Sequence, residues 1–166
     1  MSKKLWQKQK SKLHPAIEAY TVGQDYIYDN ILVPYDVQAS LAHAMMLKRL
    51  GVISSTELVK LKKAFDDILS LWERGEFQIE LADEDVHTAI ENYLIGKLGD
   101  LGKKIHTGRS RNDQVLVAMH LYIKDSLLEV VDGVDAFIEI LTAFKKGYGK
   151  IAMPGYTHMQ RAMPMN

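Results

Sequence analysis

The chain has 166 residues with 21 basic and 21 acidic side chains, and its formal net charge is +0. This balance argues against binding to nucleic acid or membranes by gross electrostatics. The absence of cysteine excludes disulfides and thiolate metal sites, and no apolar run matches a transmembrane helix or a signal-peptide core. The length suffices for one domain with a hydrophobic core, and we expect a soluble, cytoplasmic protein.

Helical periodicity dominates the first hundred residues. Three helices are predicted, over residues 34–50, 55–74 and 83–98, and each is followed by a glycine, as is common at helix ends. Ser54-Ser-Thr-Glu57 has the form of a capping box at the start of the second helix. The apolar positions expected to face the core are Val37, Leu41, Ala44, Met45 and Leu47, then Leu58, Leu61, Phe65, Ile68 and Trp72, and finally Val86, Ile90, Tyr93 and Leu94.

A much longer helix is predicted from about Asn112 to Lys146, where apolar residues recur in a near-heptad rhythm. Such a helix would be about 50 Å long, which is typical of a helical bundle or an oligomer core. Strand-like alternation nowhere exceeds a few residues, so the predicted fold class is all-α. We expect a helical N-terminal domain over residues 1–112 and the beginning of a central helical bundle, truncated, over residues 113–166.

The segment His106-Thr-Gly-Arg-Ser-Arg-Asn-Asp-Gln114 is the most informative part of the chain, because it has no large apolar side chain and cannot build a core. It precedes the long helix, so free backbone N–H groups and the helix dipole should favour an anion there. Arg109 and Arg111 can bind carboxylates in bidentate fashion, and Gly108 lets the backbone approach a ligand closely. The alternative is a solvated, capped loop.

A second polar cluster is Asp83-Glu-Asp-Val-His-Thr-Ala-Ile-Glu91. Its acidic residues suit the first turn of a helix, where they complement the dipole. His87 and Glu91 are i,i+4 neighbours beside the apolar stripe and form half of a possible metal site, but no second histidine stands at ligand spacing. We therefore expect no metal; His87 is either structural or faces a ligand together with Thr88.

The last residues form a third polar cluster after the long helix. Gly147, Gly149 and Pro154-Gly155 are expected to break that helix. Tyr156-Thr-His-Met-Gln-Arg161 follows, and the sequence stops two residues after Pro164. A long bundle helix without an antiparallel neighbour leaves its apolar face exposed, so we expect this chain to be part of a longer protein.

Together, the three polar clusters resemble the argininosuccinate lyase branch of the aspartase/fumarase superfamily. The resemblance covers essentially the whole chain and rests on residues 83–91, 106–114 and 154–162, of which the second is highly specific for this branch. Tyr35-Asp-Val-Gln-Ala-Ser40 also resembles the family's first core helix. Two positions depart from the family pattern: Trp6-Gln-Lys-Gln-Lys10 replaces Trp-Gly-Gly-Arg-Phe, and Asp25 stands where a substrate-contacting serine is common.

The resemblance implies reversible cleavage of argininosuccinate into arginine and fumarate by β-elimination, in arginine biosynthesis. It implies a homotetramer with active sites shared between subunits, and chemistry that needs no cofactor or metal. The family's third signature, a mobile serine-containing loop, is absent here, so the 166 residues alone are expected to be inactive. The implied catalytic residue is His158, and the implied substrate-binding residues are His87, Arg109, Ser110, Arg111, Asn112 and Thr157.

Several alternatives stay open at this point. In the family, either the histidine corresponding to His158 or the loop serine serves as the base. The substrate can be another N-substituted succinate, because binding determinants also lie outside these residues. The protein can also be a non-catalytic helical scaffold, since some lens crystallins resemble this enzyme.

Overall fold

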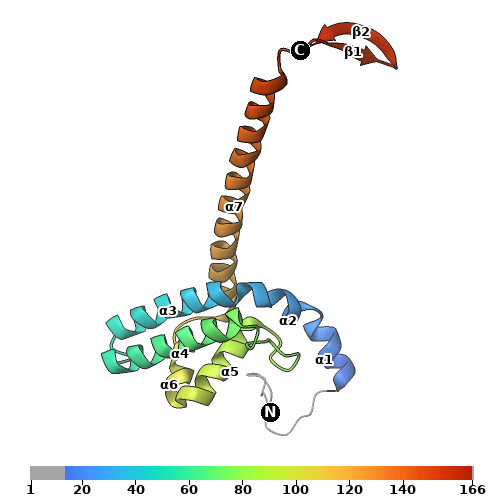
Figure 1. Cartoon of the computed structure of the whole chain (residues 1–166). Coiled ribbons are helices and arrows are strands. Elements are labelled where there is room, and N and C mark those ends of the chain that lie inside the picture. Colours follow the sequence, from blue (N-terminus) through green and yellow to red (C-terminus); the bar gives the residue numbers. More distant parts are fainter. Residues whose placement is uncertain (1–13, 166) are drawn as a thin grey trace. The chain divides into compact units, whose positions relative to one another are not determined.

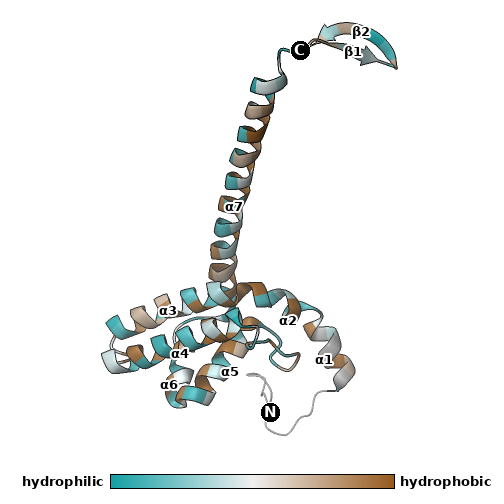
Figure 2. Ribbon diagram, viewed as in Figure 1, coloured by the Kyte–Doolittle hydropathy of each residue, from teal (hydrophilic) through white to brown (hydrophobic). Residues whose placement is uncertain are grey.

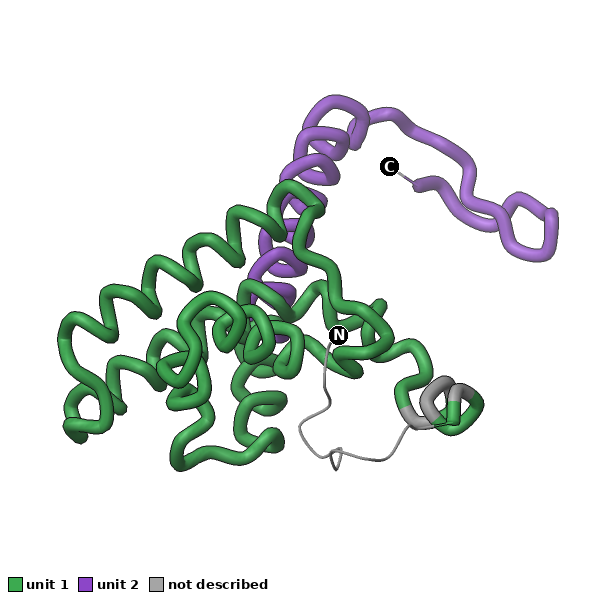
Figure 3. The backbone as a smooth tube through the Cα atoms, turned by 90° about the horizontal axis from the view of Figure 1, so that it is seen from below, with its two compact units in different colours: residues 1–122 green, residues 123–166 purple. Residues whose placement is uncertain are grey.

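The structure is a computed structural model that describes residues 14–165 (Figure 1). The altered motif Trp6–Lys10 lies outside the described residues. The chain divides into two compact units, residues 1–122 and 123–166 (Figure 3). The domain boundary expected near residue 112 stays a prediction.

Helices account for most of the described chain, which confirms the all-α prediction apart from one small sheet. The elements in order are α1 (Pro15–Val22), α2 (Asp25–Tyr28), the 3-10 helix η1 (Asp29–Leu32), α3 (Val33–Arg49), α4 (Ser55–Glu73), α5 (Val86–Leu98), α6 (Asp100–Lys103), the 3-10 helix η2 (Lys104–His106), α7 (Arg111–Tyr148), β1 (Met153–Thr157) and β2 (Gln160–Met165).

The core of the first unit lies among α3, α4 and α5, which pack against one another (Figures 1 and 2). Burying each large apolar side chain in such a core contributes about 1.5–3 kcal/mol. Met45 was expected to face the core but is 43% exposed, because it lies on the solvent side of α3 between the buried Ala44 and Leu47. The fully buried large apolar residues are Val33, Leu47, Leu61, Phe65, Ile68, Val86, Leu94 and Ile105.

The capping box predicted at the start of α4 is present. The Ser54 hydroxyl accepts a hydrogen bond from the backbone N–H of Glu57 at 3.2 Å, and the Glu57 carboxylate accepts one from the N–H of Ser54 at 2.7 Å. Glu57 also receives the Lys104 ammonium at 2.8 Å. The Lys104 hydrogen bond is the main cause that lowers the pKa of Glu57 to about 2, and the Ser54 bonds lower it further.

The start of α5 differs from the prediction, because the acidic residues 83–85 precede the helix instead of forming its first turn. Asp85 is the N-cap residue, and its carboxylate accepts from the N–H of Thr88 at 2.8 Å. A second carboxylate, that of Asp29, accepts from the N–H of Val86 at 3.1 Å. Burial raises the pKa of Asp29, although this hydrogen bond opposes the effect. Side-chain caps thus replace the expected acidic first turn.

The long helix is continuous over 38 residues in α7, as the near-heptad pattern predicts. In the second unit its apolar side chains are exposed, and brown residues recur along α7 in Figure 2. Among the described residues, no helix combines the length and the hydropathy needed to cross a bilayer. The exposed apolar residues of this stretch include Leu127, Val130, Val134, Phe137, Leu141 and Phe144.

The polar C-terminal segment is an antiparallel hairpin of β1 and β2, which the sequence analysis did not predict. Thr157 pairs with Gln160, so His158 and Met159 form a two-residue turn. Both turn residues have positive φ, 47° and 64°, which is the backbone twist that connects tightly paired strands. A Cβ added at Gly155 in β1 would lie 2.6 Å from Met165 Sδ and 3.0 Å from the Met163 carbonyl oxygen, so a side chain there would force Met165 and the paired strand to shift.

The capping box at α4 leads to a stability prediction. We expect Ser54→Ala to lower the free energy of unfolding by about 1 kcal/mol, because the Glu57 N–H loses its partner. Chemical denaturation followed by circular dichroism measures the change. Ser70→Ala is the matched control, since Ser70 lies inside the same helix and donates only to the Asp66 carbonyl. Equal stability of the two variants would contradict a stabilising role for the cap.

Candidate functional site

The segment 106–114 runs from the end of η2 into the first turn of α7. Gly108 has φ +76°, a left-handed conformation that favours glycine. Ser110 closes the start of α7, because its N–H donates to Asp113 at 2.8 Å while its hydroxyl accepts from the Asp113 N–H at 3.4 Å. The Ser110 N–H is the main cause that lowers the pKa of Asp113. The segment is therefore a capped helix start held in one conformation.

Two histidines tie the beginning of this segment to α3 and α5. His106 Nδ1 pairs with the buried carboxylate of Glu91 at 2.9 Å. His43, on α3, places its Nε2 2.9 Å from the carbonyl oxygen of Thr107, so this nitrogen carries the proton and donates. His87 and Glu91 were considered as half of a metal site, but Glu91 pairs with His106 instead. Nowhere in residues 14–165 do three potential metal-ligating His, Asp or Glu side chains gather.

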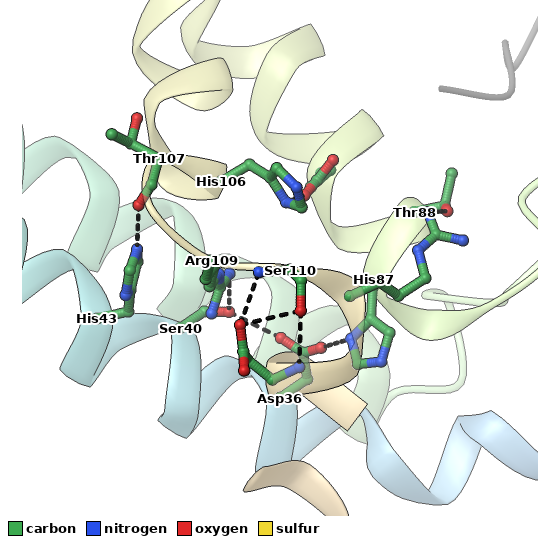
Figure 4. Close-up of polar contacts among 12 residues, drawn as sticks. Asp36, Ser40, His43, His87, Thr88, His106, Thr107, Arg109 and Ser110 are labelled. Carbon is green, nitrogen blue, oxygen red and sulfur yellow. Dashed lines mark hydrogen bonds and ion pairs between the residues drawn. The ribbon is translucent and has the colours of Figure 1, made fainter. Parts of the chain in front are cut away.

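A chain of polar contacts continues from the segment into the core (Figure 4). The Arg109 guanidinium donates from Nη2 to the Ser40 hydroxyl at 2.9 Å, and Ser40 donates to Asp36 Oδ1 at 2.8 Å. The other carboxylate oxygen of Asp36 contacts Nδ1 of His87. Burial lowers the pKa of Arg109, although the nearby charge of Asp36 opposes this. Two of the predicted site residues, Arg109 and His87, are thus connected through Asp36 and Ser40.

Arg111 begins α7 and reaches the N-terminus of α5. Its Nη1 donates to Asp85 Oδ2 at 2.7 Å, and its Nη2 donates to the Thr88 hydroxyl at 2.9 Å. Asp85 therefore caps α5 and binds Arg111 at the same time. The side chain of Arg111 is 36% exposed, and a guanidinium has five N–H donors, so further donors are accessible to a ligand.

The two amide side chains of the segment, Asn112 and Gln114, have opposite environments. Asn112 is exposed in the first turn of α7, whereas Gln114 is 3% exposed. Within the described residues, Gln114 Oε1 and Arg109 Nε are buried polar atoms without a hydrogen-bond partner. Unpaired buried polar atoms are costly, and both of these atoms belong to residues 106–114, hereafter the signature segment.

The remaining predicted site residues, Thr157 and His158, belong to the second unit. Thr157 ends β1, and His158 is the first residue of the hairpin turn. Both side chains are exposed. A non-glycine residue at positive φ costs of the order of 1 kcal/mol, and such strain is common at functional turns. Asp25, where the family often has serine, is the exposed first residue of α2.

Asp36, Ser40 and His43 were not predicted as site residues from the sequence. They are spaced by four and three positions, so they form one polar stripe on α3 beside the apolar face. This short polar stripe is the sequence signal for these site residues. A stripe of solvent-exposed residues on a helix would normally be longer and contain more charged side chains. Burial of Asp36 and Ser40, each 1% exposed, could not be read from the spacing alone.

Comparison with known proteins gives consistent matches along the chain. The model of a family described as lyase matches residues 9–166. An argininosuccinate lyase of Thermotoga neapolitana is 47% identical over 164 residues, and one of Bacteroides fragilis is 44% identical over the same number. A third, from Sorangium cellulosum, is 42% identical over 164 residues.

These alignments cover 99% of this chain and 41%, 36% and 38% of the respective relatives. The chain therefore spans about two fifths of the length of the curated relatives that it matches. The resemblance drawn from the three polar clusters is confirmed.

The environment of His43 leads to a pH prediction. Burial lowers the pKa of His43 from its ordinary value of 6.5, and the charge of Arg109 lowers it further. The folded state therefore binds fewer protons than the unfolded state just below pH 6.5, so this contribution to stability is lost as the pH falls through that window. Nuclear magnetic resonance titration should give a pKa for His43 below 6.5, and Arg109→Gln should raise it part of the way back. A pKa of His43 at or above 6.5, or one that Arg109→Gln leaves unchanged, would contradict the prediction.

Proposed function

We propose that this chain, which belongs to the lyase family, forms part of an enzyme that cleaves argininosuccinate into arginine and fumarate. The names of its relatives support this substrate, because argininosuccinate lyases of three genera match 99% of the chain at 42–47% identity. Since the chain spans only about two fifths of those proteins, the activity of the whole protein is a proposal.

The observation that carries the proposal is the position of Arg111 at the start of α7. Its guanidinium already binds one carboxylate, that of Asp85, beside the backbone N–H groups of a helix start. Arginine forks and helix N-termini are the two protein features best suited to carboxylates. Argininosuccinate carries several carboxylates, and we assign one of them to Arg111, with Asn112 as a neighbouring donor and with Ser110, whose hydroxyl donates to Asp113 in this structure, as a further substrate-binding residue.

The proposed elimination begins when a base removes a proton from the carbon next to a substrate carboxylate. The resulting carbanion spreads its charge into that carboxylate as an aci-form. Its electron pair then forms the C=C bond of fumarate as the C–N bond breaks, and the departing guanidino nitrogen takes a proton from a general acid to give arginine. Fixed donors aimed at the carboxylate oxygens are the most effective means to stabilise such charge. Arg111, Asn112 and Thr157 are donors of the required type, and Ser110 shares its hydroxyl with Asp113.

His158 is proposed as the catalytic side chain that transfers or positions a proton. An imidazole titrates near neutral pH, so it can serve as acid or base under physiological conditions. Its place on an exposed, tight turn supports a functional role, since that position contributes nothing to a core. Either His158 or a serine outside these residues abstracts the proton, and both schemes need the His158 ring.

His87 and Arg109 are proposed to bind substrate from inside the first unit. Both side chains belong to the polar chain that runs through Asp36 and Ser40. His87 contacts Asp36, and Arg109 donates to Ser40, which donates to Asp36. No step of the proposed reaction requires a metal or an organic cofactor.

For the whole protein we propose a homotetramer with shared active sites, which acts in the cytoplasm in arginine biosynthesis. The exposed apolar stripe of α7 supports association, because exposed apolar patches of this kind mark interaction surfaces. Residues Leu127 to Phe144 are the stretch that another helix would cover.

The direct test is the release of fumarate from argininosuccinate, followed by ultraviolet absorbance, with the protein in its full natural length. We expect turnover with argininosuccinate and none with adenylosuccinate, another N-substituted succinate. Turnover of adenylosuccinate instead would assign the chain to a sister reaction. Complete lack of turnover and of argininosuccinate binding would leave a helical scaffold as the function.

The role of Arg111 can be tested by Arg111→Lys. Lysine keeps the charge but loses the planar fork, so we expect kcat/KM to fall about 10- to 100-fold, the value of one charged hydrogen bond. Arg74→Lys is the matched control, because Arg74 also binds a carboxylate, that of Glu76, but on the surface of the first unit. If the Arg111→Lys variant kept the kcat/KM of the parent protein, Arg111 would lie outside the substrate site.

The role of His158 can be tested by His158→Asn, which keeps the size of the side chain and removes the titratable ring. We expect kcat to fall about 10²–10⁴-fold, the usual scale of general acid–base catalysis. His120→Asn, an exposed histidine on α7, is the control and should keep its turnover. Near-normal kcat and an unchanged pH profile in His158→Asn would exclude both a catalytic and an orienting role.

A further inference from the structure

We propose that Asp36 is a positioning residue that orients His87 and Arg109 for substrate, an inference that rests on the function proposed above. Asp36 and His87 are 1% and 2% exposed, so contacts within the protein, and not water, orient the carboxylate and the ring. They come from α3 and α5, and 51 residues separate them along the chain.

Both oxygens of the Asp36 carboxylate are used. Oδ2 contacts Nδ1 of His87, and Oδ1 accepts from the Ser40 hydroxyl at 2.8 Å. An ionised carboxylate is costly to bury unless donors satisfy it, and these two contacts supply the donors. The burial of Asp36 therefore depends on the orientation of its two partners, and it constrains them in return.

The direction of every hydrogen bond in this chain follows from the chemistry of its members. Arg109 can only donate, so the oxygen of Ser40 must accept at 2.9 Å. Ser40 has a single hydroxyl hydrogen, which it gives to Asp36. A carboxylate can only accept, so Nδ1 of His87 carries a proton. Asp36 is thus the terminal acceptor for two segments at once, the signature segment through Ser40 and α5 through His87.

This arrangement sets the state of the His87 ring. With Nδ1 protonated against Asp36, a neutral ring presents Nε2 as an acceptor, and a charged ring presents it as a donor. In either state the ring plane is held by the Asp36 contact. Carboxylates behind metal-ligating histidines orient the ring in this way, and their loss typically costs about 10- to 100-fold in metal affinity or activity. We expect the same scale for a histidine that binds substrate.

A purely structural role explains the contacts less well. Apolar residues on α3 such as Val37, Ala44 and Leu47 already pack in the core, and buried ion pairs are often replaced by apolar residues without loss of stability. What distinguishes Asp36 is that, among the described residues, its hydrogen bonds lead to two residues of the proposed substrate site, to His87 directly and to Arg109 through Ser40.

The test begins with the tautomer of His87, which does not depend on the identity of the substrate. Imidazole ¹⁵N shifts measured by nuclear magnetic resonance should show a protonated Nδ1 in the parent chain. In Asp36→Asn the amide can offer an N–H to the ring, so we expect the proton to move to Nε2. Asp67→Asn is the matched control, because it breaks an ion pair with Lys97 on the surface and should leave the His87 signals unchanged.

Turnover of argininosuccinate by the protein in its full natural length provides the second readout. We expect Asp36→Asn to lower kcat/KM about 10- to 100-fold and to alter the pH profile, while circular dichroism shows a folded protein. A folded Asp36→Asn variant that keeps the Nδ1 proton of His87, or that keeps kcat, KM and pH profile, would overturn the proposal.

Ser40→Ala provides an independent variant in case Asp36→Asn does not fold. It removes the link to Arg109 and leaves the pair of Asp36 with His87 intact. We expect this variant to keep the His87 tautomer and to have a raised KM. An unchanged KM would overturn the proposal that Asp36 positions Arg109 through Ser40. If the parent lacks argininosuccinate turnover, the proposed function fails, whereas a failure of the positioning role alone leaves turnover intact and the tautomer insensitive to Asp36.

Discussion

A carboxylate inside a hydrophobic core constrains everything that contacts it, and Asp36 has this place in the first unit. Its two oxygens need donors, and the donors come from His87 on α5 and from Ser40 one turn further along α3. Because Ser40 also accepts from Arg109, the same constraint reaches the signature segment before α7. Helix packing and the position of two candidate site residues therefore depend on one buried polar chain.

The start of α7 illustrates how stability and function share the same groups. Ser110 and Asp113 form reciprocal hydrogen bonds at the start of the helix, and Arg111, its first residue, reaches α5. There Asp85 caps α5 and binds Arg111, so a substrate carboxylate at Arg111 would meet a guanidinium that is already oriented. Orientation before binding lowers the entropic cost of holding a ligand, which is why a rigid helix start is a favourable anion site.

Local patterns predicted the elements whose causes are local. The capping box at Ser54 and the near-heptad rhythm of α7 both depend on residues within a few turns, and both were correct. The start of α5 was misplaced, because Asp85 bonds to the N–H of Thr88 instead of lying in the first turn. The hairpin was missed because its strands are held by pairing between Met153–Thr157 and Gln160–Met165, with two prolines and little alternation to reveal it.

The sequence by itself determined the helical fold class, the three polar clusters and the family to which the chain belongs, since each is written in residue types and short spacings. Only the tertiary structure decided that Asp36 contacts His87, or that Glu91 pairs with His106 instead of sharing a site with its helical neighbour His87. Periodicity states which face of a helix a residue occupies, but not which segment lies opposite. That choice is made by the packing of α3, α5 and the signature segment, whose contacting residues lie 15 to 69 positions apart.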